Sequence, residues 1–202
     1  MEKRVVLPGE KIADGRAKIP HTFFDGEATY AEVIGTLDEE GRYIALESAY
    51  RPSVGDTIIG IVTNIRRAGY LVDLNLPQEG LIVGRDVKVK LQRGDIVMCR
   101  VKMVTEVGDT ELGEVRRLPR GKVVDFPPSK TPRLIGRKSS MLNLLREHAE
   151  GDVMVGNNGY VWISEKSNIP LVLKAISLVK QKAHRSGLTD EMAEMLKKET
   201  QG

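Results

Sequence analysis

The sequence predicts a mainly β protein that carries an α/β part at its C-terminal end. One observation is a series of short β-branched runs with glycines at their corners, which fills the middle of the chain. Another is the set of Pro-Gly and Asp-Gly pairs that separate short apolar runs near the N-terminus. The last is a change of pattern after a proline-rich stretch near residue 130, where amphipathic helical spacing begins. Together these observations predict three successive domains.

The expected N-terminal β domain covers residues 1–52. The segments AEVIGTL and RYIALES flank residues 38–41, a four-residue turn that ends in glycine, and this arrangement predicts a hairpin. The Arg-Pro-Ser sequence at 51–53 has the composition of a boundary, so the domain is expected to end there.

The second expected domain, residues 53–126, is a small barrel of five strands. Residues 57–65 are a β-branched run with a glycine inside it, which indicates a bend or a bulge. Residues 70–74 and 96–104 alternate with the period of a strand. Strands this short and curved, with glycines at the corners, are typical of a small closed barrel.

The third expected domain, residues 127–202, mixes helices with strands. Residues 127–132 are rich in proline and indicate a stiff linker. A helix is expected at 140–150, and two strands are expected around an Asn-Gly turn at 158–159. Amphipathic spacing predicts two further helices, at 170–184 and 188–199.

The composition excludes several kinds of site and of protein. Cys99 is the only cysteine among 202 residues, so an intrachain disulfide and a multi-cysteine zinc site are excluded. The net charge of +3 is too small to identify a partner by itself. The first ten residues lack the apolar segment of a signal peptide, and no apolar run is long enough to span a membrane. We therefore expect a soluble, cytoplasmic protein.

Signals of catalysis are weak in this sequence. The three histidines, His21, His148 and His184, lie in separate regions, and none has a neighbouring ligand at metal-binding spacing. No cluster of carboxylates suits a two-metal nuclease, and no GxxxxGK[ST] nucleotide-binding loop occurs. We therefore expect a binding protein with no catalytic residue, no metal and no cofactor.

The barrel segment resembles the S1-type RNA-binding OB-fold. The resemblance rests on Gly-Asp pairs at 55–56 and 94–95, the run GYLVDL at 69–74 and a Gly-Leu pair at 80–81. Such folds bind single strands with a charged groove and exposed aromatic residues. Positions that often hold an aromatic residue and a histidine are Leu71 and Val83 here, so the remaining contacts would be electrostatic.

Arginines of the barrel are the candidates for these electrostatic contacts with RNA. They are Arg66, Arg67, Arg93, Arg100, Arg116 and Arg117. Their positive charge would attract the phosphates of a single strand. The alternative is that they are solvated charges on a small barrel.

The third segment resembles a KH domain. After the apolar Ile135 comes a loop of four residues that opens a helix, as the GxxG loop of the family does. This basic loop consists of Gly136, Arg137, Lys138 and Ser139, with serine in place of the last glycine. Ser139 is expected to cap the helix, and helix N–H groups beside two cations favour a phosphate. The alternative is a helix start with exposed charges.

A second glycine loop matches the letters GxxG but has different surroundings. This GNNG turn consists of Gly156, Asn157, Asn158 and Gly159. Apolar residues alternate on both sides of it as they do in strands, and no basic residue is adjacent. Asn-Gly supplies the positive φ angles of a tight turn. We therefore interpret these four residues as a structural hairpin turn packed against the barrel.

The order of the segments, from VLPGE near the N-terminus through an S1-type barrel to one KH domain, resembles the archaeal exosome cap subunit of the S1–KH type. This is the ribosomal RNA-processing protein 4 family. The resemblance implies three copies on a hexameric ring of RNase PH-type subunits, alone or mixed with the zinc-ribbon cap subunit. It also implies a non-catalytic cap, docked through its N-terminal domain, that feeds single-stranded RNA to phosphorolytic 3'–5' exoribonuclease sites for degradation and processing. The alternative is a free-standing S1–KH protein that acts in transcription or translation, as NusA does.

Overall fold

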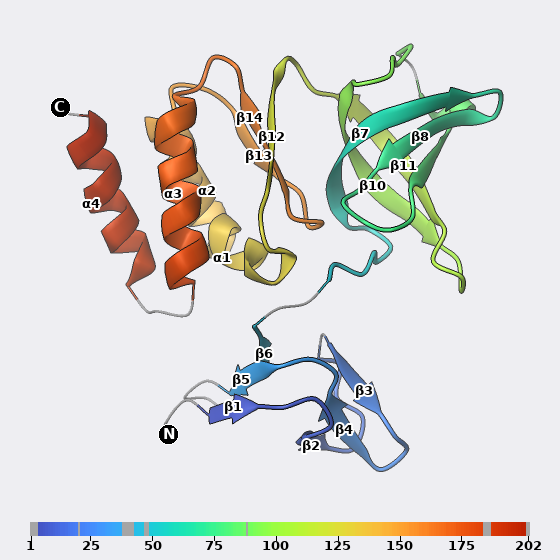
Figure 1. The fold of residues 1–202 in the computed structure, drawn as a ribbon, viewed down its shortest axis with the longest axis vertical. Coiled ribbons are helices and arrows are strands. Elements are labelled where there is room, and N and C mark those ends of the chain that lie inside the picture. Colours follow the sequence, from blue (N-terminus) through green and yellow to red (C-terminus); the bar gives the residue numbers. More distant parts are fainter. Residues whose placement is uncertain are drawn as a thin grey trace. The chain divides into compact units, whose positions relative to one another are not determined.

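The chain folds into two compact units, Met1–Ala49 and Tyr50–Gly202. The computed structural model describes residues 4–19, 21–37, 43–46, 49–87, 89–183 and 187–200. The described residues of the first unit form strands and no helix, while the second unit contains both a barrel and the α/β part (Figure 1). The mainly β architecture with a C-terminal α/β part that the sequence predicted is thereby confirmed.

The first unit consists of two three-stranded antiparallel sheets, with the orders β1-β5-β6 and β2-β4-β3. The strands are β1 (Arg4–Val6), β2 (Lys11–Asp14), β3 (Thr22–Phe24), β4 (Ala28–Ala31), β5 (Gly35–Leu37) and β6 (Tyr43–Ala45). Val6, Ala31 and Tyr43 form its small core. β5 and β6 pair as the predicted hairpin requires, while the turn expected at 38–41 lies outside the described residues.

The second unit begins with a closed barrel of five strands, which confirms the predicted barrel. The strands are β7 (Thr57–Arg66), β8 (Gly69–Asp73), β9 (Gly80–Val83), β10 (Ile96–Val104) and β11 (Thr110–Arg117). Their order is β10-β11-β9-β8-β7, and pairing of β7 with β10 closes the barrel. Val97, Cys99 and Val101 alternate along β10 and point into the buried core, as the period of two predicts.

The C-terminal part combines a three-stranded sheet with helices. Its elements are β12 (Gly121–Asp125), α1 (Thr131–Ile135), α2 (Ser140–His148), β13 (Val153–Val155), β14 (Tyr160–Ser164), α3 (Ile169–Lys182) and α4 (Leu188–Thr200). The sheet has the antiparallel order β12-β14-β13. The helices cover one face of this sheet, and the barrel lies on the other side (Figure 1).

Two segments of the second unit differ from the expectation. Residues 121–125 were expected within the barrel domain. They form β12, which pairs with β14 and not with a strand of the barrel. Residues 127–132, expected to be a stiff linker, contain a 3-10 turn (Pro128–Lys130) and the first residues of α1. Pro132 lies in the first turn of α1, where a backbone N–H would have no intrahelical partner. Proline therefore did not prevent a helix here.

The central strand β14 is buried on both faces because it separates two apolar clusters. Val161 and Ile163 pack with the helices. Tyr160 and Trp162 face the other way and pack with Ile59 of the barrel. The barrel and the C-terminal part are thus joined by a buried apolar interface within one unit.

Candidate nucleic-acid interface

The basic loop, residues 136–139, connects α1 to α2 by a tight turn. Gly136 has a φ of 75°, and a Cβ atom there would lie 2.8 Å from the backbone nitrogen of Met141, so the position requires glycine. The backbone nitrogen of Ser139 donates a hydrogen bond of 3.2 Å to the carbonyl oxygen of Gly136. This geometry brings the loop backbone and its side chains to the surface.

Ser139 does not cap α2, contrary to the expectation. Its side chain makes no capping hydrogen bond, and its backbone is left-handed, with φ 61° and ψ 21°, whereas an N-cap residue is extended. Lys138 is also left-handed, with a φ of 52°. A left-handed position favours glycine, so serine at residue 139 is strained by roughly 1 kcal/mol.

Arg137 and Lys138 are exposed, and neither forms an ion pair in the part of the chain that the structure describes. The first N–H groups of a helix lack intrahelical partners and favour negative charge. The basic loop therefore offers both cations and backbone donors to a phosphate.

A hollow of about 390 Å³ lies beside the basic loop, between α1 and the GNNG turn. It is lined by Pro128, Thr131, Pro132, Ile135, Gly136 and Asn157. Oγ1 of Thr131 is buried and has no hydrogen-bond partner among the described residues. Apolar walls with a few polar atoms suit a small, flat group such as a nucleobase.

The six predicted arginines of the barrel lie in three places and do not form one patch. The groups are Arg66 with Arg67, Arg93 with Arg116 and Arg117, and Arg100. The first group forms the turn between β7 and β8. In the second group, Arg116 and Arg117 pair with Met98 and Val97 near the start of β10, and Arg93 comes three residues before that strand. Arg100 lies farther along β10, opposite Gly113.

Two of these arginines are held by carboxylates. Arg117 Nη2 lies 2.8 Å from Oδ1 of Asp95, and Arg100 Nη1 lies 3.6 Å from Oε1 of Glu114. The other four form no ion pair within the described ranges: Arg66, Arg67, Arg93 and Arg116. Their charges therefore remain available to a phosphate backbone.

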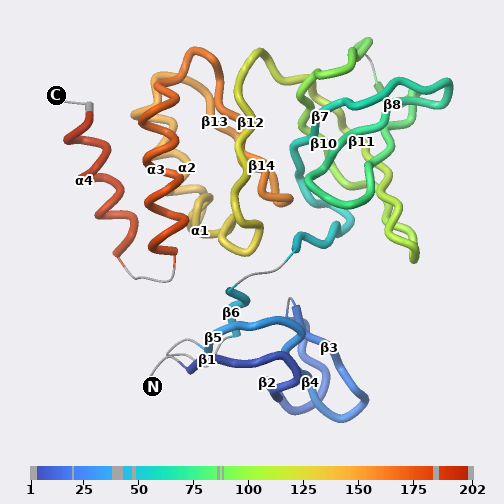
Figure 2. Tube along the Cα trace, viewed as in Figure 1, coloured from blue at the N-terminus to red at the C-terminus, as the bar shows by residue number. Residues whose placement is uncertain are grey.

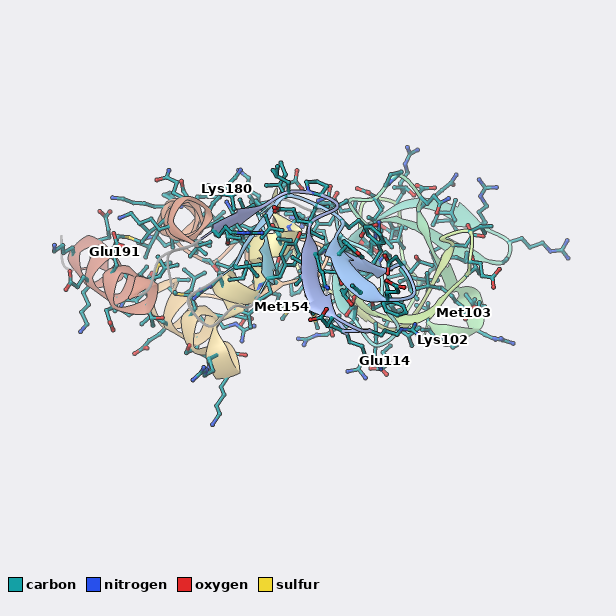
Figure 3. The ribbon with its side chains drawn as sticks, turned by 90° about the horizontal axis from the view of Figure 1, so that it is seen from below. Lys102, Met103, Glu114, Met154, Lys180 and Glu191 are labelled. Atoms are coloured by element: carbon teal, nitrogen blue, oxygen red, sulfur yellow. The ribbon has the colours of Figure 1, made fainter. Side chains whose placement is uncertain are left out.

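Arg85 and Lys102 are basic residues of the barrel surface that the sequence interpretation missed. Together with Arg100 they line a hollow of about 580 Å³. Figure 3 shows Lys102 and Glu114 next to each other at the barrel surface. Lys102 could have been found from its spacing of two residues from Arg100 on one strand face. Arg85 lies in a turn after β9, where no periodic pattern indicates which way a side chain points.

The surface of β8 and β9 has no exposed aromatic side chain. Leu71 and Val83 are half-buried, and the half-buried Tyr70 packs against the barrel core. Nucleobases stack on exposed aromatic rings in many single-strand binding folds. On these two strands that contribution is missing.

The GNNG turn joins β13 to β14 and contacts the barrel through Asn158, which is fully buried. Asn158 Nδ2 donates to the carbonyl oxygens of Ile59 (2.7 Å) and Leu74 (2.9 Å), and its Oδ1 accepts from Ile59 N (3.2 Å). The backbone nitrogen of Asn157 donates to the carbonyl oxygen of Thr57 at 2.9 Å. The polar groups of the turn are therefore directed at the barrel rather than at solvent.

Two further features fix the GNNG turn in place. Gly159 has a φ of 85°, and a Cβ atom there would collide with the carbonyl oxygen of Phe126. The hydroxyl of Tyr160 donates to Oδ2 of Asp73 on β8 at 2.7 Å. The pKa of Tyr160 is raised, mainly by burial and to a smaller extent by this hydrogen bond. The phenol therefore stays neutral and remains a donor.

The fold is similar to that of known proteins. A family model described as KH domain matches residues 121–169, from β12 to the start of α3. The chain is 32% identical to the exosome complex component Rrp4 of Pyrococcus abyssi, covering 96% of this chain and 82% of that protein. For Rrp4 of Thermococcus kodakarensis the identity is 33%, with coverage of 96% and 85%. The chain belongs to the Rrp4 family of exosome complex components.

The fold of this Rrp4 family member is also similar to that of a solved structure. It is the crystal structure of a protein assigned as an exosome complex RNA-binding protein, with a TM-score of 0.67 and 27% identity. The match covers 76% of this chain and 98% of the other.

Two features of other protein classes are absent from the described residues. No group of three or more His, Cys, Asp and Glu side chains is placed to hold a metal ion in the described ranges. Among the same residues, no helix has the length and apolar character needed to cross a membrane.

Proposed function

We propose that this member of the Rrp4 family is a non-catalytic RNA-binding subunit of a cytoplasmic exosome. Three copies, alone or mixed with the zinc-ribbon cap subunit, would form a cap on a hexameric RNase PH-type ring. The cap would bind single-stranded RNA and feed it to the phosphorolytic 3'–5' sites of the ring for degradation and processing. The proposal is supported by relatives that are named exosome complex components, and the similarity to them extends over most of their length.

The observation that carries the RNA-binding part of this proposal is the position of the basic loop. It lies between α1 and α2 of a KH-type fold and presents Arg137 and Lys138 without ion pairs among the described residues. Buried contacts of the GNNG turn attach this fold to a barrel that carries further arginines without ion pairs to any described residue. One polyanionic strand could therefore contact both parts of the second unit.

The first unit has the properties expected of a docking part. Its described residues expose large apolar side chains at Val5, Leu7, Phe23, Phe24, Ile34 and Ile44. Exposed apolar groups in so small a unit favour contact with another protein. We infer that this unit docks on the ring.

Native mass spectrometry of the chain mixed with an RNase PH-type ring tests the assembly. We expect three copies of the chain, or of chain plus zinc-ribbon subunit, on each hexamer. Phe24→Glu should reduce this association, whereas Val107→Glu, at another exposed apolar residue on the barrel, should not. RNA binding without any association to the ring would instead favour the free-standing S1–KH alternative.

Fluorescence anisotropy with a labelled single-stranded RNA tests the basic loop. Arg137→Glu combined with Lys138→Glu should weaken binding about tenfold and flatten the salt dependence, because the log–log slope falls by about 0.7 for each phosphate that the protein no longer neutralises. Lys197→Glu with Lys198→Glu, an equal charge change on exposed positions of α4, is the matched control. Equal affinities of the two double variants would rule out the assignment of the loop.

A further inference from the structure

A hollow of about 500 Å³ lies at the junction of the barrel and the C-terminal sheet. Its walls come from the loop before β10, the connection from β11 to β12 and the start of α3. Within the sheet, Gly121 at this junction pairs with Ser164, whereas Asp125 pairs with Tyr160 beside the GNNG turn. In Figure 2 the connection from β11 to β12 is at the top of the second unit and α1 is at the bottom. The junction hollow is therefore separate from the basic loop.

Three cations line the junction hollow: Arg117, Arg120 and Lys122. Arg117 is fixed by its ion pair with Asp95, whose side chain is only 12% exposed. Asp95 Oδ2 in turn accepts a hydrogen bond of 2.7 Å from the backbone nitrogen of Gln92. The guanidinium is thus held at the edge of the hollow, with donors left over for a ligand.

The side chains of the other two cations have no partner among the described residues. The side chains of Arg120 and Lys122 are exposed, and neither forms a hydrogen bond or an ion pair in the described part of the chain. Glu165 also lines the hollow, but its carboxylate is not within ion-pair distance of either cation; its backbone nitrogen donates to the carbonyl oxygen of Arg120. Two positive charges therefore face the hollow without a counter-charge bound to them.

The rest of the lining is largely apolar. Leu118 is buried, and Ile96, Pro119 and Ile169 complete the apolar surface. An apolar surface beside cations suits a nucleotide, because the base or ribose can cover the apolar side chains while the phosphate reaches the cations. The volume lies within the range of small-molecule sites.

We propose that the junction hollow binds one nucleotide of a single-stranded RNA, with its phosphate against Arg120 and Lys122. The inference rests on the proposed RNA-binding function and adds a site to it. It gives a single strand a contact between the arginines at the end of β11 and the C-terminal fold, at the opposite end of β12 from the basic loop. The local sequence, RRLPRGK at 116–122, supplies all three cations of the hollow.

Charge reversal at the junction is the direct test. In the full chain, Arg120→Glu with Lys122→Glu should weaken binding of a labelled single-stranded RNA about tenfold, and the salt slope should fall by about 0.7 for each phosphate that the variant leaves unbound. Lys197→Glu with Lys198→Glu again changes the net charge equally at a distant helix. Thermal unfolding should be the same in both variants, because all four side chains are exposed.

The outcomes separate the inference from the function on which it rests. If the wild type binds RNA and the junction variant matches the control variant, the junction site is rejected while the proposed function stands. If the wild type does not bind RNA, both are rejected.

A second measurement identifies the ligand. A strand carrying 4-thiouridine should crosslink to the peptide that contains residues 117–122, and its absence among crosslinked peptides would overturn the proposal. At equal ionic strength, phosphate and chloride should reduce RNA binding by the same factor. If phosphate reduces RNA binding more than chloride does, and the junction variant lacks this difference, the hollow is a site for free phosphate instead of RNA.

Discussion

Removing the buried amide of Asn158 should destabilise the whole second unit. Asn158→Ala deletes three hydrogen bonds, two accepted by carbonyl oxygens and one donated by the backbone nitrogen of Ile59. Each bond contributes about 1 kcal/mol, and leaving the buried backbone groups unpaired costs more, so a total loss of about 4 kcal/mol is expected. For a unit of this size that corresponds to a fall in Tm of about 12 °C.

The matched control for this experiment is the neighbouring asparagine. Asn157 is half-buried, and its side chain donates one hydrogen bond, to Oδ1 of Asp56 at 3.0 Å. Asn157→Ala should therefore cost about 1 kcal/mol. Differential scanning calorimetry of both variants measures the difference. Equal melting temperatures would refute the view that Asn158 joins the two parts of the unit.

Asn158→Asp separates hydrogen bonding from packing, because it preserves the size of the side chain. A carboxylate can accept from Ile59 N but cannot donate to the two carbonyl oxygens, so the variant should be as unstable as alanine at neutral pH. Burial beside two carbonyl oxygens should raise the pKa of this carboxyl above its unfolded value of about 3.9. Because the folded pKa is the higher one, stability should be regained as the pH falls through it and lost as the pH rises.

Three further outcomes are expected. Ser139→Gly should raise the free energy of unfolding by about 1 kcal/mol, since glycine adopts the left-handed backbone without strain; urea denaturation measures it, and a destabilised variant would contradict the strain argument. Gly159→Val should lower Tm strongly, because its side chain would meet the carbonyl oxygen of Phe126, and an unchanged Tm would show that the turn is not constrained. Burial raises the pKa of the Cys99 thiol to about 12, so a thiol reagent should label it at pH 8 only on unfolding; rapid labelling of folded protein would contradict its burial. Because the folded thiol has the higher pKa, the free energy of unfolding should fall as the pH rises above the pKa of an unfolded cysteine, about 8.5.

The parts of the fold that were predictable from sequence are those fixed by nearby residues. The strand period in β10 and the Asn-Gly turn between β13 and β14 depend on local geometry, so both could be predicted. The pairing of β12 could not, because its partner β14 is distant in the chain and the local sequence does not identify that partner. The short helix α1 was hidden by prolines that are compatible with a first turn.

The candidate site also contains features that nearby residues predict and features that they do not. A glycine followed by two cations and a helix identified the basic loop, because those residues are adjacent in sequence. The left-handed backbone of Ser139 could not be predicted, since serine is a favourable N-cap residue and its local preference points to a different conformation. The junction hollow combines side chains from separate segments, so its lining required the three-dimensional arrangement.

Because β14 is buried on both faces, this protein is difficult to dissect into single domains. A fragment that begins at β12 would expose Tyr160 and Trp162, which the intact second unit covers with Ile59 of the barrel. Such a fragment should aggregate or pair with itself, and its RNA affinity would describe a surface that the whole chain does not present. Truncations made between Ala49 and Tyr50 leave this interface complete, so they are the suitable basis for assigning functions to the two units.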